Sequence, residues 1–395
     1  MYNQMTFPYP VYDADAHLVE TPDWLLPYAD KTIRERLSPI AVQRMKPDTP
    51  AEVEIANWRR RHWDPAEREA AEREIMTRKG WAAMGSFIKE HRPRALDLLG
   101  FSAQLVSTTL LAYPLFEAEQ ADDLDFAYRY AEAHNRGIVD FCAADKRLLP
   151  VAYLPLADFE RSAAMAEEAI GMGCKALRIS QSCPHGHAPS HVGLDPVWAR
   201  AQEHGVPIVF HVRENKGIID PAYYNNGSPT EHDFLGGQGE NYHCVNYMAI
   251  PRDAMQTLAT MIFDGVLDRF PRLKFGVLEM GASWVPGWMR YMDVGFQAFR
   301  KHEDRLQRLS APPSDIVRRQ IRVTPHPLED VSWIAAGTGE EVPMFGSDYP
   351  HVEGGRDPLR SAERSATAMS ERARRRFYCD NFLDLVGPGA NLANC

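Results

Sequence analysis

Short apolar runs rich in Val, Ile, Leu and Phe recur along the chain, and longer segments with helical periodicity separate them. This alternation is typical of β/α units that wrap helices around a parallel sheet. Eight such runs are predicted as strands, which favours a closed (β/α)8 TIM barrel over an open sheet. The predicted strands are Val11–His17, Gln104–Thr108, Leu148–Leu154, Cys174–Ser180, Val206–His211, Lys274–Glu279, Ile321–Thr324 and Pro343–Asp348.

Two segments do not fit a bare barrel, and we treat them as insertions in a single domain that spans residues 1–395. Residues 25–100 are strongly charged and have a helical pattern, as in "PAEREAAEREIMTRKGW". Residues 212–252 form a Gly-, Asn- and His-rich excursion after the fifth predicted strand. Long loops in compact domains are usually functional, so this second insertion is predicted to be a substrate lid or, equally, a dimer interface.

The charge pattern narrows the range of partners. The sequence has 44 Lys and Arg against 54 Asp and Glu, a formal net charge of −10, with both signs interspersed. No basic face is expected for phosphates, so nucleic acid is not predicted as a partner. No apolar run reaches the roughly 18 residues of a membrane helix, and the first residues do not resemble a signal peptide. We therefore expect a cytoplasmic protein that does not contact membranes.

Cysteine usage gives no sign of a structural framework. The six cysteines lie far apart and include no CxxC pair. This spacing fits neither a set of disulfides nor a thiolate zinc cluster.

Polar side chains stand at the ends of four predicted strands. The first strand ends in Asp15 and His17, the fifth in His211, the sixth in Glu279 and the eighth in Asp348. The carboxyl ends of barrel strands meet at one rim, where barrel enzymes keep their active sites. Charged groups at such a water-poor rim are costly unless paired, and a divalent cation is the simplest partner for carboxylates and imidazoles. The ligand types suit zinc, Fe(II) or manganese.

Each of these residues also has a plain structural interpretation. His211 alone could be a buried histidine with ordinary partners, Asp348 a helix cap, and Asp15 with His17 the polar face of a surface strand. Glu279 could pair with an arginine such as Arg178 or Arg322. Their joint occurrence at strand ends is what favours a metal site.

Three further residues belong to the predicted site. Asp13 lies on the same side of its strand as Asp15 but deeper, so it is predicted to orient the ligands rather than to bind metal. His326 and His351 follow the seventh and eighth predicted strands, where substrate contact and plain loop structure are equally good interpretations.

The sequence resembles the amidohydrolase superfamily, in particular the amidohydrolase-related branch that contains aminocarboxymuconate-semialdehyde decarboxylase-like enzymes. The resemblance covers the first strand and nearly everything from about residue 100 to 385, in the order that the family uses. The segments that carry it are "DADAHLVETPDW", "RLLPVAYLPLADFE", "LDPVWARAQEHGVPIVFH", "GVLDRFPRLKFGVLEMGASWVPGWMRYMD" and "FGSDYPHVEG".

The resemblance implies a metal site with named ligands. Asp15 and His17 stand where the superfamily has its first-strand HxH ligands, His211 where it has the fifth-strand ligand, and Asp348 where it has the eighth-strand acid. Glu279 departs from the similar decarboxylases, which usually have histidine at that position, so it is predicted to serve as a base or to reach a second metal. One metal is the default, because no fourth-strand lysine is placed to bridge two.

Metal-dependent hydrolysis is the leading functional expectation from the sequence. A metal-activated water would cleave an amide, ester or thioester of a small aromatic or apolar acid. Asp348 would act as general base and then acid, Glu279 would share that duty, and Arg213 would pair with a substrate carboxylate. The first alternative is non-oxidative decarboxylation of an aromatic or unsaturated acid, and the second is a non-catalytic ligand-binding barrel. A homodimer is the expected assembly.

Overall fold

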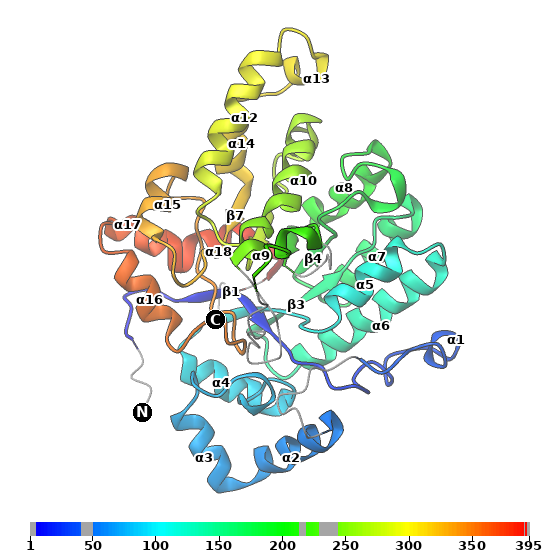
Figure 1. The fold of residues 1–395 in the computed structure, drawn as a ribbon, viewed down its shortest axis with the longest axis vertical. Helices are drawn as coiled ribbons and strands as arrows, with labels where there is room; N and C mark the ends of the chain where they lie inside the picture. The colour runs from blue at the N-terminus through cyan, green and yellow to red at the C-terminus, as the bar shows by residue number, and fades with distance from the viewer. Residues whose placement is uncertain (1–4, 41–49, 213–218, 229–243, 391, 393–395) are drawn as a thin grey trace.

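The computed structural model describes residues 5–40, 50–212, 219–228, 244–390 and 392. Its centre is a curled parallel sheet of seven strands in sequence order, with helices packed around it (Figure 1). Every strand residue is buried, as expected for strands covered on both faces. The strands are β1 (Tyr12–His17), β2 (Ala103–Ser107), β3 (Leu148–Tyr153), β4 (Ala176–Arg178), β5 (Ile208–His211), β6 (Phe275–Leu278) and β7 (Ile321–Val323).

Residues 342–349 occupy the eighth position between β7 and β1. Met344 N–H donates to the Val323 carbonyl of β7 (2.9 Å), while Ala14 N–H of β1 donates to the Phe345 carbonyl (3.0 Å). The ring is thus closed, and the predicted barrel is confirmed. The predicted eighth strand is wrong as a continuous strand, because only isolated bridges form there. Asp348 has a φ of 54°, a left-handed conformation that interrupts an extended ladder.

Helices surround this ring. Their ends follow local capping signals: the Asp158 side chain accepts the Arg161 N–H at the start of α7, and α8 stops at Gly205, whose φ is 64°. The helices from α5 to α14 are α5 (Ala112–Gln120), α6 (Leu124–Cys142), α7 (Phe159–Gly171), α8 (Asp195–His204), α9 (Cys244–Ala249), α10 (Arg252–Phe263), α11 (Val266–Arg269), α12 (Val285–Phe299), α13 (Asp304–Gln307) and α14 (Pro313–Gln320). The last helices are α15 (Val331–Thr338), α16 (Pro358–Ser365), α17 (Glu371–Arg375) and α18 (Asn381–Val386).

The N-terminal segment is helical, as its pattern predicts. It contains α1 (Lys31–Arg34), α2 (Ala51–Trp63), α3 (Pro65–Arg73) and α4 (Arg92–Leu99), of which the last three lie together beside the barrel (Figure 1). In the predicted excursion at 212–252, the described residues form a short 3-10 helix, Pro221–Tyr224, and α9. Among the described residues, no helix is both long and apolar enough to span a membrane.

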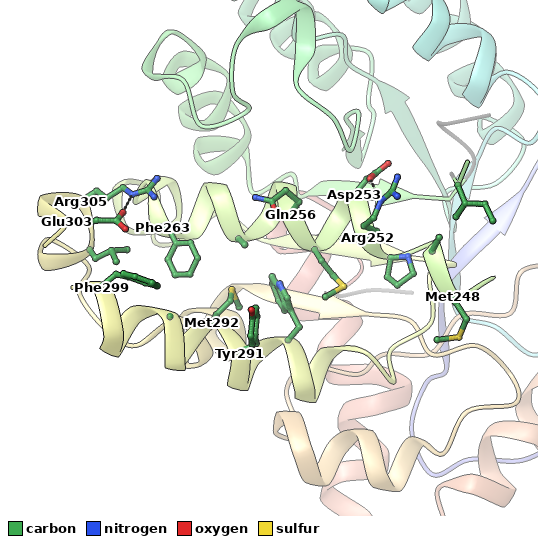
Figure 2. Close-up of a pocket in the computed structure, with 18 of the residues that line it drawn as sticks. Met248, Arg252, Asp253, Gln256, Phe263, Tyr291, Met292, Phe299, Glu303 and Arg305 are labelled. Carbon is green, nitrogen blue, oxygen red and sulfur yellow. Dashed lines mark hydrogen bonds and ion pairs between the residues drawn. The ribbon is translucent and has the colours of Figure 1, made fainter. Parts of the chain in front are cut away.

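A large apolar groove of about 960 Å³ runs between α10 and α12, on the outer side of the barrel (Figure 2). An ion pair lies at each end of it, Arg252 with Asp253 and Arg305 with Glu303. The apolar side chains that line the groove include Met248, Phe263, Trp288, Tyr291, Met292 and Phe299.

Candidate metal centre

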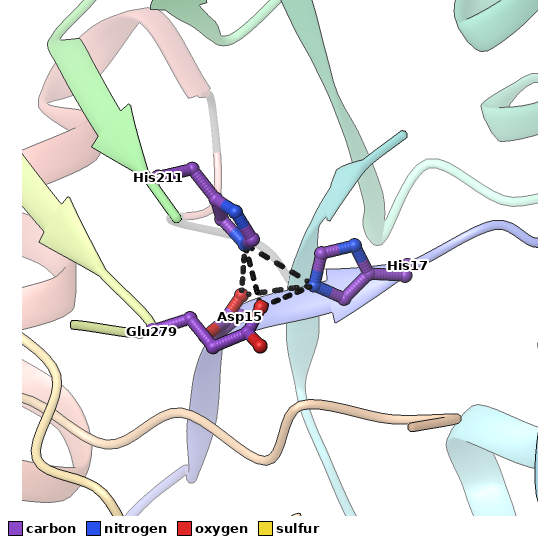
Figure 3. A group of neighbouring side chains, drawn as sticks. All are labelled: Asp15, His17, His211 and Glu279. Carbon is purple, nitrogen blue, oxygen red and sulfur yellow. Dashed lines mark hydrogen bonds and ion pairs between the residues drawn. The ribbon is translucent and has the colours of Figure 1, made fainter. Parts of the chain in front are cut away.

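Four side chains converge where β1, β5 and β6 end: Asp15, His17, His211 and Glu279 (Figure 3). One donor atom from each lies within 4.8 Å of the others. His211 Nε2 is 3.2 Å from Asp15 Oδ1, 3.2 Å from Glu279 Oε2 and 3.2 Å from His17 Nε2. The barrel thus gathers residues that lie far apart in the sequence, as the strand-end pattern predicts.

Backbone carbonyls fix how both imidazoles face the cluster. His17 Nδ1 lies 3.1 Å from the Thr108 carbonyl oxygen, and His211 Nδ1 lies 3.2 Å from that of Val212. A carbonyl only accepts hydrogen bonds, so each Nδ1 carries the proton of the neutral ring. The lone pair of each Nε2 therefore points into the cluster.

This donor set fits a divalent cation. Burial lowers the pKa of His17 and of His211 to about 4, so both rings are neutral at pH 7. Two Nε2 lone pairs then face each other and two carboxylates, with no proton to share between the rings. A cation satisfies all four groups, and imidazole with carboxylate suits manganese, Fe(II) or zinc. The cavity beside these residues is small, about 10 Å³.

Two acids of the site, Glu279 directly after β6 and Asp348 in the eighth position, are held in a strained conformation. Glu279 and Asp348 each have a φ of 54°, and His185 is the one further non-glycine residue with positive φ among the described residues. Such conformations cost about 1–3 kcal/mol and occur where surrounding structure enforces them. Here the Glu279 N–H donates to Thr324 Oγ1 (3.0 Å), and the Asp348 N–H donates to the Asp15 carbonyl (2.8 Å). In these conformations, a carboxylate oxygen of Glu279 and one of Asp348 lie in the same donor group as His17.

Asp348 shares a proton with His351. Asp348 Oδ1 is 2.7 Å from His351 Nδ1, and His351 Nε2 is 3.0 Å from Thr109 Oγ1. The Thr109 hydroxyl donates its own proton to the Leu18 carbonyl (2.6 Å), so it accepts from His351 Nε2–H. One proton must therefore lie between His351 Nδ1 and Asp348 Oδ1.

The surroundings of Asp348 favour its protonated form. Burial, followed by the negative charges of Asp15 and Glu353, raises the pKa of Asp348 well above its ordinary value. Its Oδ2 atom is buried and has no hydrogen-bond partner among the described residues. Asp348 also belongs to a second group of donor atoms that could hold a metal, together with His17, Glu279 and His351.

Asp13 lies beneath the cluster and binds protein groups. Its carboxylate accepts from Ser347 N–H (2.7 Å), Ser347 Oγ (2.6 Å), Gln104 Nε2 (2.7 Å) and Asp15 N–H (3.2 Å). These bonds join β1, β2 and the segment that carries Asp348. This arrangement matches the orienting position predicted for Asp13, whose role in activity stays a prediction.

The remaining predicted site residues are His326, Arg213 and His351, and none of them belongs to the four-residue cluster. The His326 ring lies 5.8 Å from that of Tyr247, and His326 belongs to neither donor group. Arg213 lies outside the described residues. His351 contacts Asp348 and Thr109, partners that the sequence pattern does not indicate. Sequence reasoning also missed Thr109, for which the one available signal was its place just after β2.

Comparison with known proteins supports these observations. A family model described as an amidohydrolase matches residues 12–387. The comparison with curated proteins gives no match. Among solved structures, an amidohydrolase from Mycobacterium avium subsp. paratuberculosis is similar over 97% of this chain and 99% of its own, with a TM-score of 0.72 and 20% identity.

Two similar structures are decarboxylases. A 5-carboxyvanillate decarboxylase from Novosphingobium aromaticivorans, complexed with manganese and 4-hydroxy-3-methoxy-5-nitrobenzoic acid, has a TM-score of 0.63 and 20% identity over 96% of each chain. A dihydroxybenzoic acid decarboxylase from a Polaromonas species, with manganese and the inhibitor 2-nitroresorcinol, has a TM-score of 0.61 and 16% identity over 98% of this chain and 99% of its own. At such identities, these likenesses show a common fold.

Proposed function

Because this chain belongs to the amidohydrolase family, we propose that it is a metal-dependent enzyme that removes carbon dioxide from an aromatic carboxylic acid. The proposal selects the decarboxylase alternative over the hydrolase expectation. Two of the similar folds are decarboxylases that bind manganese and aromatic ligands, which supports this choice.

The observation that carries the proposal is the 2.7 Å contact between Asp348 Oδ1 and His351 Nδ1, which requires a proton between the two atoms. Non-oxidative decarboxylation replaces a carboxylate by a proton, so it needs an acid beside the substrate. Metal-assisted hydrolysis begins instead with a base that takes a proton from water. A buried Asp348 with a raised pKa, bonded to His351, is set up as an acid.

Asp15, His17, His211 and Glu279 would hold the metal, and manganese suits these imidazole and carboxylate donors. The bound cation would supply Lewis-acid attraction for the carboxylate of the substrate and a neighbouring hydroxyl oxygen. Asp13 keeps the β1 ligands in place through its bond to the Asp15 N–H.

Asp348 carries out the proton transfer in this proposal. It gives its proton to the ring carbon that bears the carboxylate. The bond between that carbon and the carboxylate then breaks, its electron pair returns to the ring, and carbon dioxide leaves. His351, held by Thr109, keeps a proton next to Asp348 Oδ1 so that the acid is restored from solvent.

The product distinguishes the two reactions. Manganese-loaded protein is incubated with ortho-hydroxybenzoic acids, such as 2,6-dihydroxybenzoate and 5-carboxyvanillate, in D2O and separately in H2¹⁸O. We expect carbon dioxide and one deuterium at the vacated ring carbon, without ¹⁸O in the aromatic product. Cleavage of an aromatic ester or amide with ¹⁸O in the acid, and no carbon dioxide from either acid, would contradict the proposal and support hydrolysis.

We propose a homodimer that uses the groove between α10 and α12. Two of the apolar side chains that line the groove are highly exposed, Met248 at 77% and Tyr291 at 79%. Each end of the groove carries one basic and one acidic residue. A twofold arrangement brings the opposite ends together, with Arg252 facing Glu303 and Arg305 facing Asp253 of the second copy. In such a dimer, the apolar face of one copy would cover that of the other, and each basic residue at a groove end would face an acidic residue of the second copy.

A further inference from the structure

The N-terminal segment is joined to the rim of the barrel at the candidate metal centre. Gly80 N–H donates to the Pro350 carbonyl (3.0 Å), and the Tyr349 hydroxyl donates to the Met84 carbonyl (2.7 Å). Further along, Arg92 Nη1 donates to the His17 carbonyl (2.9 Å). These bonds fix residues 79–92 against the two segments that carry His17 and Asp348.

Lys79 stands where this segment first meets the rim. Its Nζ atom is buried and has no hydrogen-bond partner among the described residues. Asp348 and Glu353 both favour the charged form of Lys79, and Glu353 lines the cavity beside the metal cluster. Burial lowers the pKa of Lys79 to about 8, which leaves the ammonium charged at neutral pH. The fold thus holds a cation with unused donors next to Gly80, whose N–H donates to the carbonyl of Pro350, two residues after Asp348.

Among the residues that the structure describes, the other buried or half-buried lysines are hydrogen-bonded or ion-paired within the protein. Lys89 Nζ lies 2.7 Å from Asp140 Oδ2, Lys274 Nζ lies 2.9 Å from Asp384 Oδ2, and Lys175 Nζ donates to the Gly389 carbonyl (2.9 Å). An ammonium offers three donors, and leaving them unused in a buried place is costly. Lys79 therefore lacks the hydrogen bonds that an anionic ligand would provide.

We propose that Lys79 is a substrate-binding residue whose ammonium donates hydrogen bonds to the substrate carboxylate at the rim, beside Asp348. This inference rests on the proposed function, because it assigns the anionic group of that substrate. A carboxylate oxygen would supply the missing partner of the ammonium. Loss of carbon dioxide removes the group that Lys79 binds, so the residue favours substrate over product and assists product release.

The test compares a charged ligand with an uncharged one of the same shape. Calorimetric titration of manganese-loaded protein uses 2,6-dihydroxybenzoate and 2,6-dihydroxybenzamide as probes. For Lys79→Met we expect the affinity for the benzoate to fall about 10- to 100-fold and that for the benzamide to change less than about threefold. Lys79→Arg, which keeps the charge, is expected to retain the preference for the benzoate.

The matched control is Lys89→Met, which removes a lysine of the same segment that is fully paired with Asp140. Its affinities are expected to equal those of the wild type. Manganese content should stay unchanged in Lys79→Met, and its unfolding midpoint should not fall, because a buried charge without partners is removed. A lower midpoint with equal loss for both probes would assign Lys79 a structural role and overturn the inference.

Failure of the inference and failure of the proposed function give different results. Equal benzoate affinity in the wild type and Lys79→Met overturns the role of Lys79, whether or not carbon dioxide is released. Charge-selective binding that depends on Lys79, without carbon dioxide from any tested acid, supports the carboxylate site and overturns the decarboxylase proposal. A wild type that binds neither probe overturns both.

Discussion

The cavity at the metal cluster and the groove between α10 and α12 are opposites. The first measures about 10 Å³ and is bounded by imidazoles, acids and Arg178, whereas the second measures about 960 Å³ and is mainly apolar. Beside the small cavity, buried groups occupy costly states: neutral imidazoles with facing lone pairs, and acids in left-handed conformations. The groove contains ordinary apolar packing and surface ion pairs. Chemistry is therefore expected at the small cavity, where buried groups are held in energetically costly states, and not at the much larger groove.

The largest expected effect tests whether chemistry belongs to the small cavity. Asp348→Asn should lower kcat about a thousandfold or more, because the amide cannot act as the acid. The fold should persist, since the bond that anchors this position comes from the backbone N–H of Asp348. Steady-state kinetics and thermal unfolding measure both effects. Tyr291→Ala in the groove is the control, and wild-type turnover in Asp348→Asn would break the comparison.

Metal binding provides the second test. His211→Ala removes an Nε2 donor that lies 3.2 Å from three other donor atoms, so manganese affinity should fall at least about a hundredfold. Elemental analysis and calorimetric titration measure this loss. His326→Ala is the matched control, because His326 is on the same rim but in neither donor group. Equal metal content in both variants would remove the metal centre from the proposal.

The loss of folding stability at acid pH should also come from buried histidines of the barrel rather than from residues of the groove. Burial lowers the pKa of His134 from 6.5 to about 4, as it does for His17 and His211, while no histidine is among the described residues that line the groove. Between pH 6.5 and 4 the unfolded chain binds more protons at these positions than the folded chain. The free energy of unfolding therefore falls as the pH falls through this window.

His134 isolates this effect away from the metal cluster. From pH 7 to pH 5, metal-free wild type should lose about 2 kcal/mol more stability than His134→Gln, since the variant lacks one of the buried imidazoles. Urea unfolding at the two pH values measures the difference. Tyr291→Ala should lose as much stability as the wild type. An equal loss in His134→Gln would show that the pKa of His134 does not differ between the folded and the unfolded chain, which contradicts the expected effect.

The sequence predicts the residues of the metal cluster far better than the loop contacts around them. Asp15, His17, His211 and Glu279 each lie within two residues of the carboxyl end of a strand, and parallel strands in a closed ring bring these ends to one rim. Their convergence therefore follows from local patterns plus one topology. The seven strands were predicted to within about two residues at each end for the same reason, because buried apolar runs mark them directly.

The contacts of His351 and Lys79 and the groove itself depend on loops and long-range packing, which the pattern of apolar and polar residues does not predict. His351 turns to Asp348 because residues 348–351 leave the extended conformation, and the contact with Thr109 joins loops 242 residues apart. Lys79 reaches the rim because Gly80 bonds to Pro350, a long-range contact of a charged helical segment. The groove was not predicted either, because exposed apolar residues such as Met248 and Tyr291 become a surface only when α9, α10 and α12 are assembled.

The smallest expected effect on activity concerns the groove. Tyr291 is 79% exposed, so Tyr291→Asp should not disturb the core, yet it places a charge in the proposed dimer contact. Light scattering coupled to size exclusion should show a dimer for the wild type and a monomer for the variant, with turnover within about twofold. Trp333→Asp is the control, because Trp333 on α15 is also exposed, at 54%, and does not line the groove.

Two results would change the comparison itself. A monomeric wild type would remove the second copy as the occupant of the groove. A tenfold loss of turnover in Tyr291→Asp, with manganese retained, would mean that the apolar region serves the reaction as well as assembly. Retained turnover in the monomer would instead separate the two regions, because the exposed Tyr291 belongs to α12 while the four residues of the metal cluster lie at the ends of β1, β5 and β6.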